Sequence, residues 1–266
     1  MFNNYLNHAK ISHISEFTQF SVESWIIDKR TNNNWSPKTI RNGIISLSTF
    51  GDWLVNRKII EENPVKNIPK PKLAKQLPKH LTKEQAQLLL DWAKSFRYIY
   101  KHEKNRAVAI VATFLHTGVR KQELINLKLD DINLESNVVT VIAGKGNKDR
   151  VIPLSHTLKE LLKPYLAQRE KINDKSPYFF VNRESNNKLS DMVIKRLFEK
   201  LKKKTKFNVY CHLLRHTFAT LMLQGGCDIF SLSKMMGHSD IKTTTIYLSA
   251  TTTHLQNQIV KHPLNY

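Results

Sequence analysis

The sequence predicts a mainly α-helical protein with a small antiparallel β-sheet, an α+β fold in two domains. Apolar residues recur at helical spacing in the first 60 residues and again after residue 190. A β-branched run at 138–142 precedes a glycine-rich turn. Prolines with interleaved lysines fall in 63–80, a composition that stops helices and favours an extended linker. We therefore expect a small domain over 1–75 and a larger one over 76–266.

The small domain is expected to be helical. Ser36 as N-cap, with Pro37 at the first helical position, indicates the start of a helix. The apolar residues that follow at helical spacing are Ile40, Ile44, Leu47, Phe50 and Leu54. An earlier helix is expected from Phe17 to Ile27, and no strand pattern appears in this domain.

The large domain begins with another helix-start pattern. Thr82 and Gln85 have the spacing of a capping box, in which each side chain binds the other residue's backbone N–H. The next helix is expected over about 105–116 and ends at Gly118, a residue type suited to a helix C-terminus. Helices return from about residue 190, and their expected N-caps are Ser190 and Asp228.

Between these helices the pattern changes to strands. The run Val138–Ile142 and the pair Val151–Ile152 flank GKGNKD, which predicts a hairpin with a basic tip. A third short strand is expected over Tyr178–Val181. These segments form the small sheet of the predicted fold.

The charge indicates a polyanionic partner. The chain has 42 Lys and Arg against 22 Asp and Glu, a net charge of +20 and a pI near 9.9. Proteins this basic commonly bind nucleic acid, although a solvated basic surface would give the same totals. Residues 1–80 carry 12 basic and 6 acidic residues and 81–266 carry 30 and 16, so both domains suit one long anionic partner.

Cysteine usage and hydropathy predict a cytoplasmic protein that does not contact a membrane. Cys211 and Cys227 are too few for a disulfide scaffold, which favours a reducing compartment. The N-terminus MFNNYLNHAK lacks the apolar run of a signal peptide, and no segment approaches membrane-spanning length.

Two glycine-containing segments carry cations suited to phosphate. Arg120 follows Gly118 closely, and Glu123, one helical turn later, is placed to hold its guanidinium; alone, the two would be an ordinary surface ion pair. The hairpin tip Gly144–Arg150 carries Lys145 among glycines that let a backbone approach a ligand. The tip lacks the spacing of a P-loop, so neither segment identifies a site alone.

The segment HLLRH places three polar side chains on one helix face. His212, Arg215 and His216 lie at i, i+3 and i+4. Two histidines at this spacing can bind zinc, but the segment lacks the glutamate of an HExxH motif and no paired-cysteine motif is near. A central cation would also repel a metal, so we expect this face to bind an anion and expect no metal or cofactor.

Tyr247 follows His238 by nine residues and is a candidate nucleophile. A tyrosine on a late helix is by itself commonly a core residue. Two arginines, however, can grip phosphate oxygens in fork geometry, and a histidine can add a hydrogen bond. A phenol with a reference pKa near 10 needs a base or an electropositive site, and the leaving oxygen needs an acid such as a mobile lysine.

Taken together, four motifs resemble the tyrosine recombinases, also called the lambda integrase family. They are HTGVRKQEL, GKGNKDRVIPL, HLLRHTFAT and MGHSDIKTTTIY, and the resemblance covers almost the whole chain. It is nearest to compact Xer-type enzymes and implies a helical, SAM-like core-binding domain followed by the catalytic domain. MMGH replaces the more usual LLGH, and Lys121 and Gln122 differ from common choices.

The resemblance implies which residues bind the phosphate. Arg120 and Arg215 would bind the scissile phosphate, and His238 would hydrogen-bond one of its oxygens. Glu123 would support Arg120 from behind.

The resemblance also implies which residues move protons and form the covalent bond. Tyr247 would attack phosphorus and form a 3′-phosphotyrosine. Lys145 would protonate the leaving 5′-hydroxyl, and His212 would position the phosphate and help take the tyrosine proton.

Partners follow from the same resemblance. They are double-stranded DNA with an inverted-repeat core site and further protomers, as a homo- or hetero-tetramer that exchanges strands through a Holliday junction. A DNA translocase or accessory protein is a candidate partner. The tail after Tyr247 resembles an amphipathic helix that docks onto a neighbouring protomer. Dimer resolution and the integration or excision of a mobile element both remain open.

Two other functions compete. A type IB topoisomerase uses the same kind of site to relax DNA, and its activity on arbitrary supercoiled plasmid would distinguish it. A non-catalytic DNA-binding protein could keep the fold, and the complete set of candidate residues argues against it.

Overall fold

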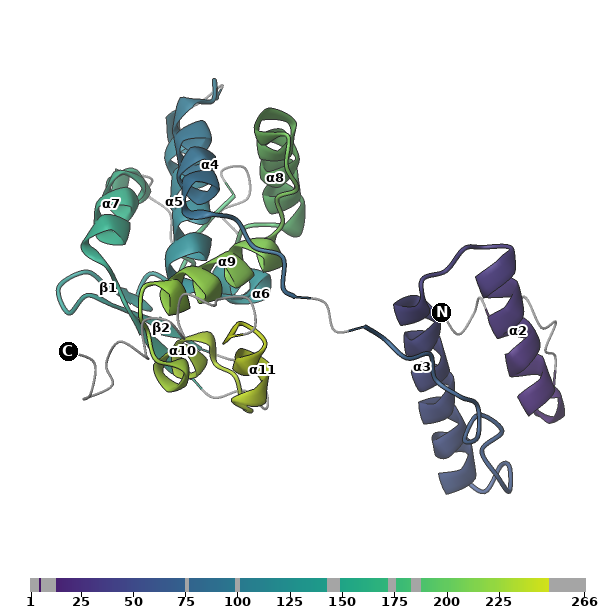
Figure 1. The fold of residues 1–266 in the computed structure, drawn as a ribbon. Helices are drawn as coiled ribbons and strands as arrows, with labels where there is room; N and C mark the ends of the chain where they lie inside the picture. Colours follow the sequence, from purple (N-terminus) through teal and green to yellow (C-terminus); the bar gives the residue numbers. More distant parts are fainter. Residues whose placement is uncertain are drawn as a thin grey trace, which may run out of the picture. The chain divides into compact units, whose positions relative to one another are not determined.

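The computed structural model describes residues 5, 13–74, 77–98, 101–142, 149–171, 176–182 and 188–248. The chain divides into two compact units, Met1–Gln76 and Leu77–Tyr266 (Figure 1). Most described residues are helical, and three short strands form one antiparallel sheet, so the predicted fold class is confirmed. Within the described ranges, every helix is too short or too polar to span a bilayer.

The described part of the first unit contains a short 3₁₀ turn and two long helices. These are η1 (Ile14–Glu16), α2 (Gln19–Thr31) and α3 (Pro37–Asn56). Thr18 and Ser36 cap the two helices by accepting hydrogen bonds from the backbone N–H of Ser21 and Thr39. The buried apolar side chains of both helices form one core, which includes Val22, Trp25, Ile40, Ile44, Leu47 and Leu54.

The second unit is built around one central helix. Its larger helices are α4 (Lys83–Ser95), α5 (Lys101–Thr117), α7 (His156–Lys171), α8 (Asp191–Thr205) and α9 (Cys211–Gln224). Every residue of 107–115 is buried, and α5 packs against α4, α7 and α9 (Figure 1). A helix that is apolar on all sides belongs in the interior, which explains its central place. Thr82 and Gln85 form the predicted capping box at the start of α4.

The sheet places one charged residue on its buried face. It consists of β1 (Ile132–Asn133), β2 (Val138–Val141) and β3 (Arg150–Pro153), in the order β1-β2-β3. Val139 pairs with Ile152 and Val141 with Arg150, and all four side chains are buried. Because successive strand residues face opposite sides, Arg150 is directed to the same side as Ile152.

The predicted hairpin is confirmed, but the predicted third strand is wrong. Among the described residues, Tyr178 and Val181 form only isolated bridges, and the third strand of the sheet is β1. The segment before β2 turns back directly onto it, so this two-residue strand supplies the pairing. A strand of two residues is too short to give an alternating pattern in the sequence.

The last described elements form a second, smaller core. They are α10 (Ile229–Met236) and α11 (Lys242–Thr245), which pack with α9. Earlier in the chain, α6 (Lys121–Asn126) joins α5 to the sheet. The residues of this core are Phe218, Ala219, Leu223, Leu232, Met236 and Tyr247. The ring of Tyr247 is therefore part of the packing between α9, α10 and the segment after α11.

Candidate active site

Gly118 allows the chain to turn from α5 into the site. Its φ is +61°, and a Cβ at this position would lie 2.3 Å from Cδ1 of Phe218. Only glycine satisfies both constraints at low cost. The turn ends α5 and leaves Arg120 as the N-cap residue of α6, where its half-buried side chain faces the site.

Glu123 joins two arginines. Its carboxylate accepts hydrogen bonds from the Arg120 backbone N–H at 2.6 Å and from the Arg120 guanidinium at 2.9 Å. Arg150 donates two more, at 3.0 and 2.7 Å, in a bidentate pair. Burial alone raises the pKa of Glu123, but these hydrogen bonds and charges lower it to about 2. The carboxylate therefore stays ionised and fixes both cations.

Arg150 belongs to the site, although the sequence reasoning gave it no role. It is only 8% exposed, and its Nε donates to the carbonyl of Met235 at 2.7 Å. Gly237 packs directly on it, because a Cβ there would lie 2.9 Å from the Arg150 side chain. The available signal was the alternation of β3, which puts Arg150 on the same face as the buried Ile152.

Arg215 is held by carbonyl groups from two other segments. It lies on α9, is 5% exposed, and donates to the carbonyls of Gly118 at 2.5 Å and Met236 at 2.7 Å. Burial, followed by the nearby charge of Arg120, lowers the pKa of Arg215 to about 10, so it remains a cation at neutral pH. The carbonyl of Gly237 lies 3.4 Å from Nη2 of Arg120. Arg120 and Arg215 therefore contact adjacent backbone carbonyls, those of Gly237 and Met236.

His238 connects Arg215 to the segment that carries the tyrosine. Nη2 of Arg215 lies 3.0 Å from Nε2 of His238, and the guanidinium can only donate. Nε2 is therefore the acceptor, and the proton of the neutral ring is assigned to Nδ1, which lies 2.8 Å from the Oγ1 of Thr244. Burial and the charge of Arg215 lower the pKa of His238 to about 4, which keeps the ring neutral near pH 7.

Tyr247 is buried, with its hydroxyl bonded to a histidine. Its side chain is 2% exposed, and its Oη lies 2.7 Å from Nδ1 of His216. Burial raises the pKa of the phenol, while Arg215 acts in the opposite direction. His212, one turn earlier on α9, is exposed.

The structure brings together residues from widely separated segments. The predicted residues that meet in this cluster are Arg120, Glu123, Arg215, His238 and Tyr247. The residues that the sequence did not indicate are Arg150 and Thr244, and His216, which was expected to bind an anion on one face with His212 and Arg215, instead contacts Tyr247. Lys145 lies outside the described residues, as does the tail over 249–266. Chemically, the cluster offers fixed cations for an anion beside a phenol that could act as a nucleophile.

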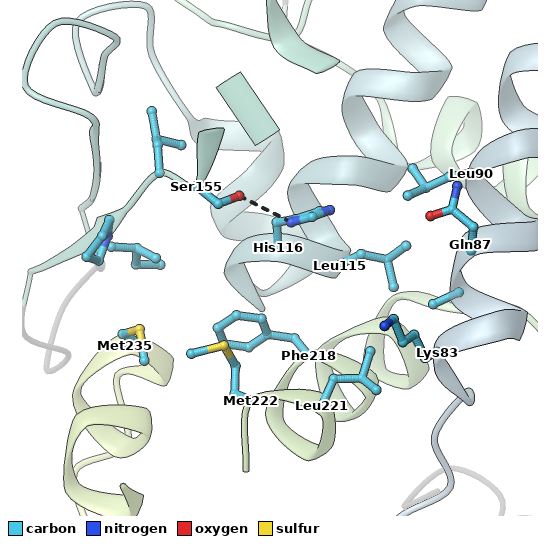
Figure 2. Close-up of a pocket in the computed structure, with 14 residues that line it drawn as sticks. Lys83, Gln87, Leu90, Leu115, His116, Ser155, Phe218, Leu221, Met222 and Met235 are labelled. Carbon is cyan, nitrogen blue, oxygen red and sulfur yellow. Dashed lines mark hydrogen bonds between the residues drawn. The ribbon is translucent and has the colours of Figure 1, made fainter. Parts of the chain in front are cut away.

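A separate pocket of about 570 Å³ has mainly apolar walls. Figure 2 shows Phe218 and Met222 from α9 and Met235 from α10 among its lining residues. At one side of the pocket, Oγ of Ser155 lies 3.5 Å from Nδ1 of His116. Burial lowers the pKa of His116. Although Lys83 also lines it, the mainly apolar wall suits an apolar side chain.

Comparisons with known proteins agree with this architecture. The model of the phage integrase family matches residues 79–254. Tyrosine recombinase XerA of Pyrococcus horikoshii is 38% identical over 205 residues, covering 76% of this chain and 68% of XerA. Tyrosine recombinase XerC of Thermodesulfovibrio yellowstonii is 30% identical over 295 residues, covering 98% of this chain and 96% of XerC.

Solved structures share the fold. The crystal structure of XerA recombinase aligns with a TM-score of 0.61 at 26% identity, covering 100% of this chain and 90% of that chain. The XerH site-specific recombinase, in a post-cleavage complex with a palindromic difH substrate, aligns with a TM-score of 0.78 at 23% identity. That alignment covers 98% of this chain and 76% of XerH.

Proposed function

Since the chain belongs to the phage integrase family and is a site-specific tyrosine recombinase, we propose that Tyr247 attacks a DNA phosphate held by Arg120 and Arg215. The observation that carries this assignment is the convergence of these arginines, with His238, on the segment that bears the buried phenol. Fixed donors aimed at the charge that develops on a phosphoryl group stabilise the transition state without reorganisation.

The proposed reaction is a reversible transesterification. Oη of Tyr247 forms a bond to phosphorus, the bond from phosphorus to the 5′-oxygen breaks, and the DNA is left as a 3′-phosphotyrosine. The leaving 5′-oxygen takes a proton from a general acid, a role that the resemblance gives to Lys145. Attack by a 5′-hydroxyl from another duplex reverses these steps and reseals the DNA. One phosphodiester replaces another of similar energy, so no ATP is consumed.

The proposed partner is double-stranded DNA with an inverted-repeat core site. The net charge of +20 supports it, because such a charge suits contact with many phosphates. The helical unit Met1–Gln76 would be the core-binding domain, and the enzyme would act in the cytoplasm. XerH was solved bound to a palindromic difH substrate, which is consistent with a site of this symmetry.

A tetramer on two duplexes is the proposed working assembly. The apolar pocket beside α9 supports it, because an apolar helix from a neighbouring protomer could bury its side chains there (Figure 2). The tail over 249–266 would supply that helix. A DNA translocase or another accessory protein would regulate the assembly rather than take part in the chemistry.

Covalent trapping tests the assignment of the nucleophile. The DNA flanking the gene is searched for an inverted repeat, a nicked duplex carrying that repeat is incubated with the protein, and the adduct is mapped by mass spectrometry. We expect a 3′-phosphotyrosine on Tyr247, no adduct with Tyr247→Phe, and unchanged DNA binding by that variant. An adduct on another residue would overturn the assignment, and relaxation of arbitrary plasmid by the monomer would favour a topoisomerase.

A further inference from the structure

The hydroxyl of Tyr247 has a partner to which the family resemblance gives no role. His216 Nδ1 lies 2.7 Å from Oη, and the two rings are 5.5 Å apart between centroids. We propose that His216 is the general base that accepts the Tyr247 proton when the phenol attacks DNA. This inference rests on the proposed function and names a further catalytic residue for it.

The distance meets the first requirement of a general base. Such a base must lie within about 2.6–3.2 Å of the atom that loses its proton. His216 and Arg215 are neighbours on α9 but face different partners, because Arg215 donates to the carbonyls of Gly118 and Met236. One helix turn therefore presents a cation to the phosphate site and a proton acceptor to the phenol.

The surroundings of His216 keep its ring neutral. Burial lowers its pKa, and three cationic or titratable neighbours, His212, Arg215 and His80, lower it further. Tyr247 faces it from the segment after α11, and burial raises the pKa of that phenol. A neutral imidazole has one unprotonated ring nitrogen, and the proposal assigns this acceptor to Nδ1, with Oη as the donor.

His238 and His212, the second of which the resemblance gives a part in taking the tyrosine proton, are less well placed. His238 uses both ring nitrogens, Nε2 toward Arg215 and Nδ1 toward Thr244. His212 is on the exposed side of α9. His216 is the histidine whose ring nitrogen points at the reacting oxygen.

The proton and the bonds balance in the proposed step. The Oη–H proton moves to Nδ1 of His216 while Oη bonds to phosphorus and the 5′-oxygen leaves with a proton from the general acid. In the reverse step the imidazolium returns its proton to Oη as the phosphotyrosine breaks. Arg215 disfavours the imidazolium and favours the phenolate, so the proton is not stored on His216 in the resting enzyme.

Two substitutions distinguish proton acceptance from positioning. His216→Ala removes the acceptor, whereas His216→Asn keeps an oxygen near the place of Nδ1 but cannot take up a proton. The control is His156→Asn, a histidine of α7 whose side chain is 88% exposed and lies outside the site. For each variant, single-turnover adduct formation on the nicked duplex is measured from pH 5 to 9, together with DNA binding and thermal unfolding.

We expect His216→Ala and His216→Asn to slow adduct formation at least about 100-fold, the usual contribution of a general base. The wild-type rate should fall in acid as His216 becomes protonated, and both variants should lose that dependence. His156→Asn should retain it. A fluorinated tyrosine at position 247, which ionises more easily, should restore much of the rate of His216→Ala.

Other results would overturn the proposal. A wild-type rate for His216→Asn would show that His216 only positions the phenol. A faster rate for His216→Ala would show that the hydrogen bond restrains the nucleophile. If His216→Ala does not fold, the Asn variant and the ¹⁵N chemical shifts of the wild-type imidazole still report whether Nδ1 is the acceptor. Absence of any adduct on Tyr247 with the wild type would instead contradict the proposed function.

Discussion

The two sides of the site are held in different ways. On the arginine side, Glu123 binds Arg120 and Arg150, and Arg215 is fixed by backbone carbonyls. On the tyrosine side, a helix of four residues is connected to the site by the Thr244–His238 and Tyr247–His216 hydrogen bonds. The arginine side is therefore held by buried charges and backbone carbonyls, whereas the tyrosine side is held by two hydrogen bonds between neutral side chains and by the packing of Tyr247 in the smaller core.

The largest effect is expected from breaking the arginine side. Arg150→Met leaves the Glu123 carboxylate buried with one partner fewer, and breaking a buried ion pair in this way commonly costs about 3–5 kcal/mol. We expect the free energy of unfolding to drop by that order, as measured by urea denaturation. Adduct formation should fall as well, because Arg120 loses the fixed carboxylate that positions it.

A control separates this cluster from arginine burial in general. Arg106 is a partly buried arginine that donates to the carbonyl of Val181 instead of to Glu123. Arg106→Met should leave the rate of adduct formation by folded protein near that of the wild type. If Arg150→Met also leaves the rate of adduct formation near that of the wild type, the Glu123 carboxylate does not position the arginines for the reaction.

A smaller effect is expected from the tyrosine side. Thr244 is fully buried, and Thr244→Val removes the oxygen that accepts the proton of His238 Nδ1. An unsatisfied buried donor costs about 1–3 kcal/mol, and the ring is then free to change tautomer. We expect a roughly tenfold slower adduct formation, where tenfold corresponds to about 1.4 kcal/mol.

Thr244→Ser keeps the hydroxyl and is the matched control. It should restore both the rate of adduct formation and the Nδ1–H tautomer, which ¹⁵N NMR of His238 reports. Equal rates for the Val and Ser variants would mean that the Thr244–His238 bond does not position the tyrosine segment.

Acid is expected to lower the stability of the two sides in different pH ranges. His238 has a pKa of about 4 when folded and a reference value near 6.5, so the unfolded chain binds the extra proton first. Its contribution to stability is complete above pH 6.5 and is lost as the pH falls toward 4. Glu123, with a pKa of about 2, contributes above its usual range near 4.5 and loses that contribution at lower pH. Acid should therefore weaken the tyrosine side before the arginine side.

Urea denaturation at pH 7, 5.5 and 4 checks the histidine component. His238→Gln should lose less stability over this range than the wild type. His156, whose side chain is 88% exposed, provides the control His156→Gln, which should follow the wild type. Parallel losses in the wild type and His238→Gln would show that His238 does not carry this dependence.

Local signals in the sequence predicted much of the fold. The N-caps Ser36 and Thr82 and the break at Gly118 lie where they were expected, because capping and left-handed turns depend on neighbouring residues. The hairpin was predictable from β-branched residues on either side of a turn. Strand β1 was not, because it exists only by pairing with β2.

Only the site residues that lie in the family motifs could be predicted from the sequence. The family motifs indicated Arg120, Arg215 and Tyr247, and the structure brings them close together. The contacts of Arg150 and His216 depend on how β3 meets α6 and how α9 meets the segment after α11. Such approaches between distant segments leave no periodic trace in a single sequence.

Two glycines with a left-handed backbone, Gly118 and Gly237, have a consequence for how related genes are interpreted. Gly118 and Gly237 each precede a residue of the site by one or two positions. Gly118 packs against the side chain of Phe218, and Gly237 packs against that of Arg150. A mobile-element gene that has lost either glycine would encode a protein with a complete set of reactive side chains but a distorted scaffold. These two codons are therefore useful markers for separating working copies from decayed ones in a genome, independently of whether the tyrosine codon survives.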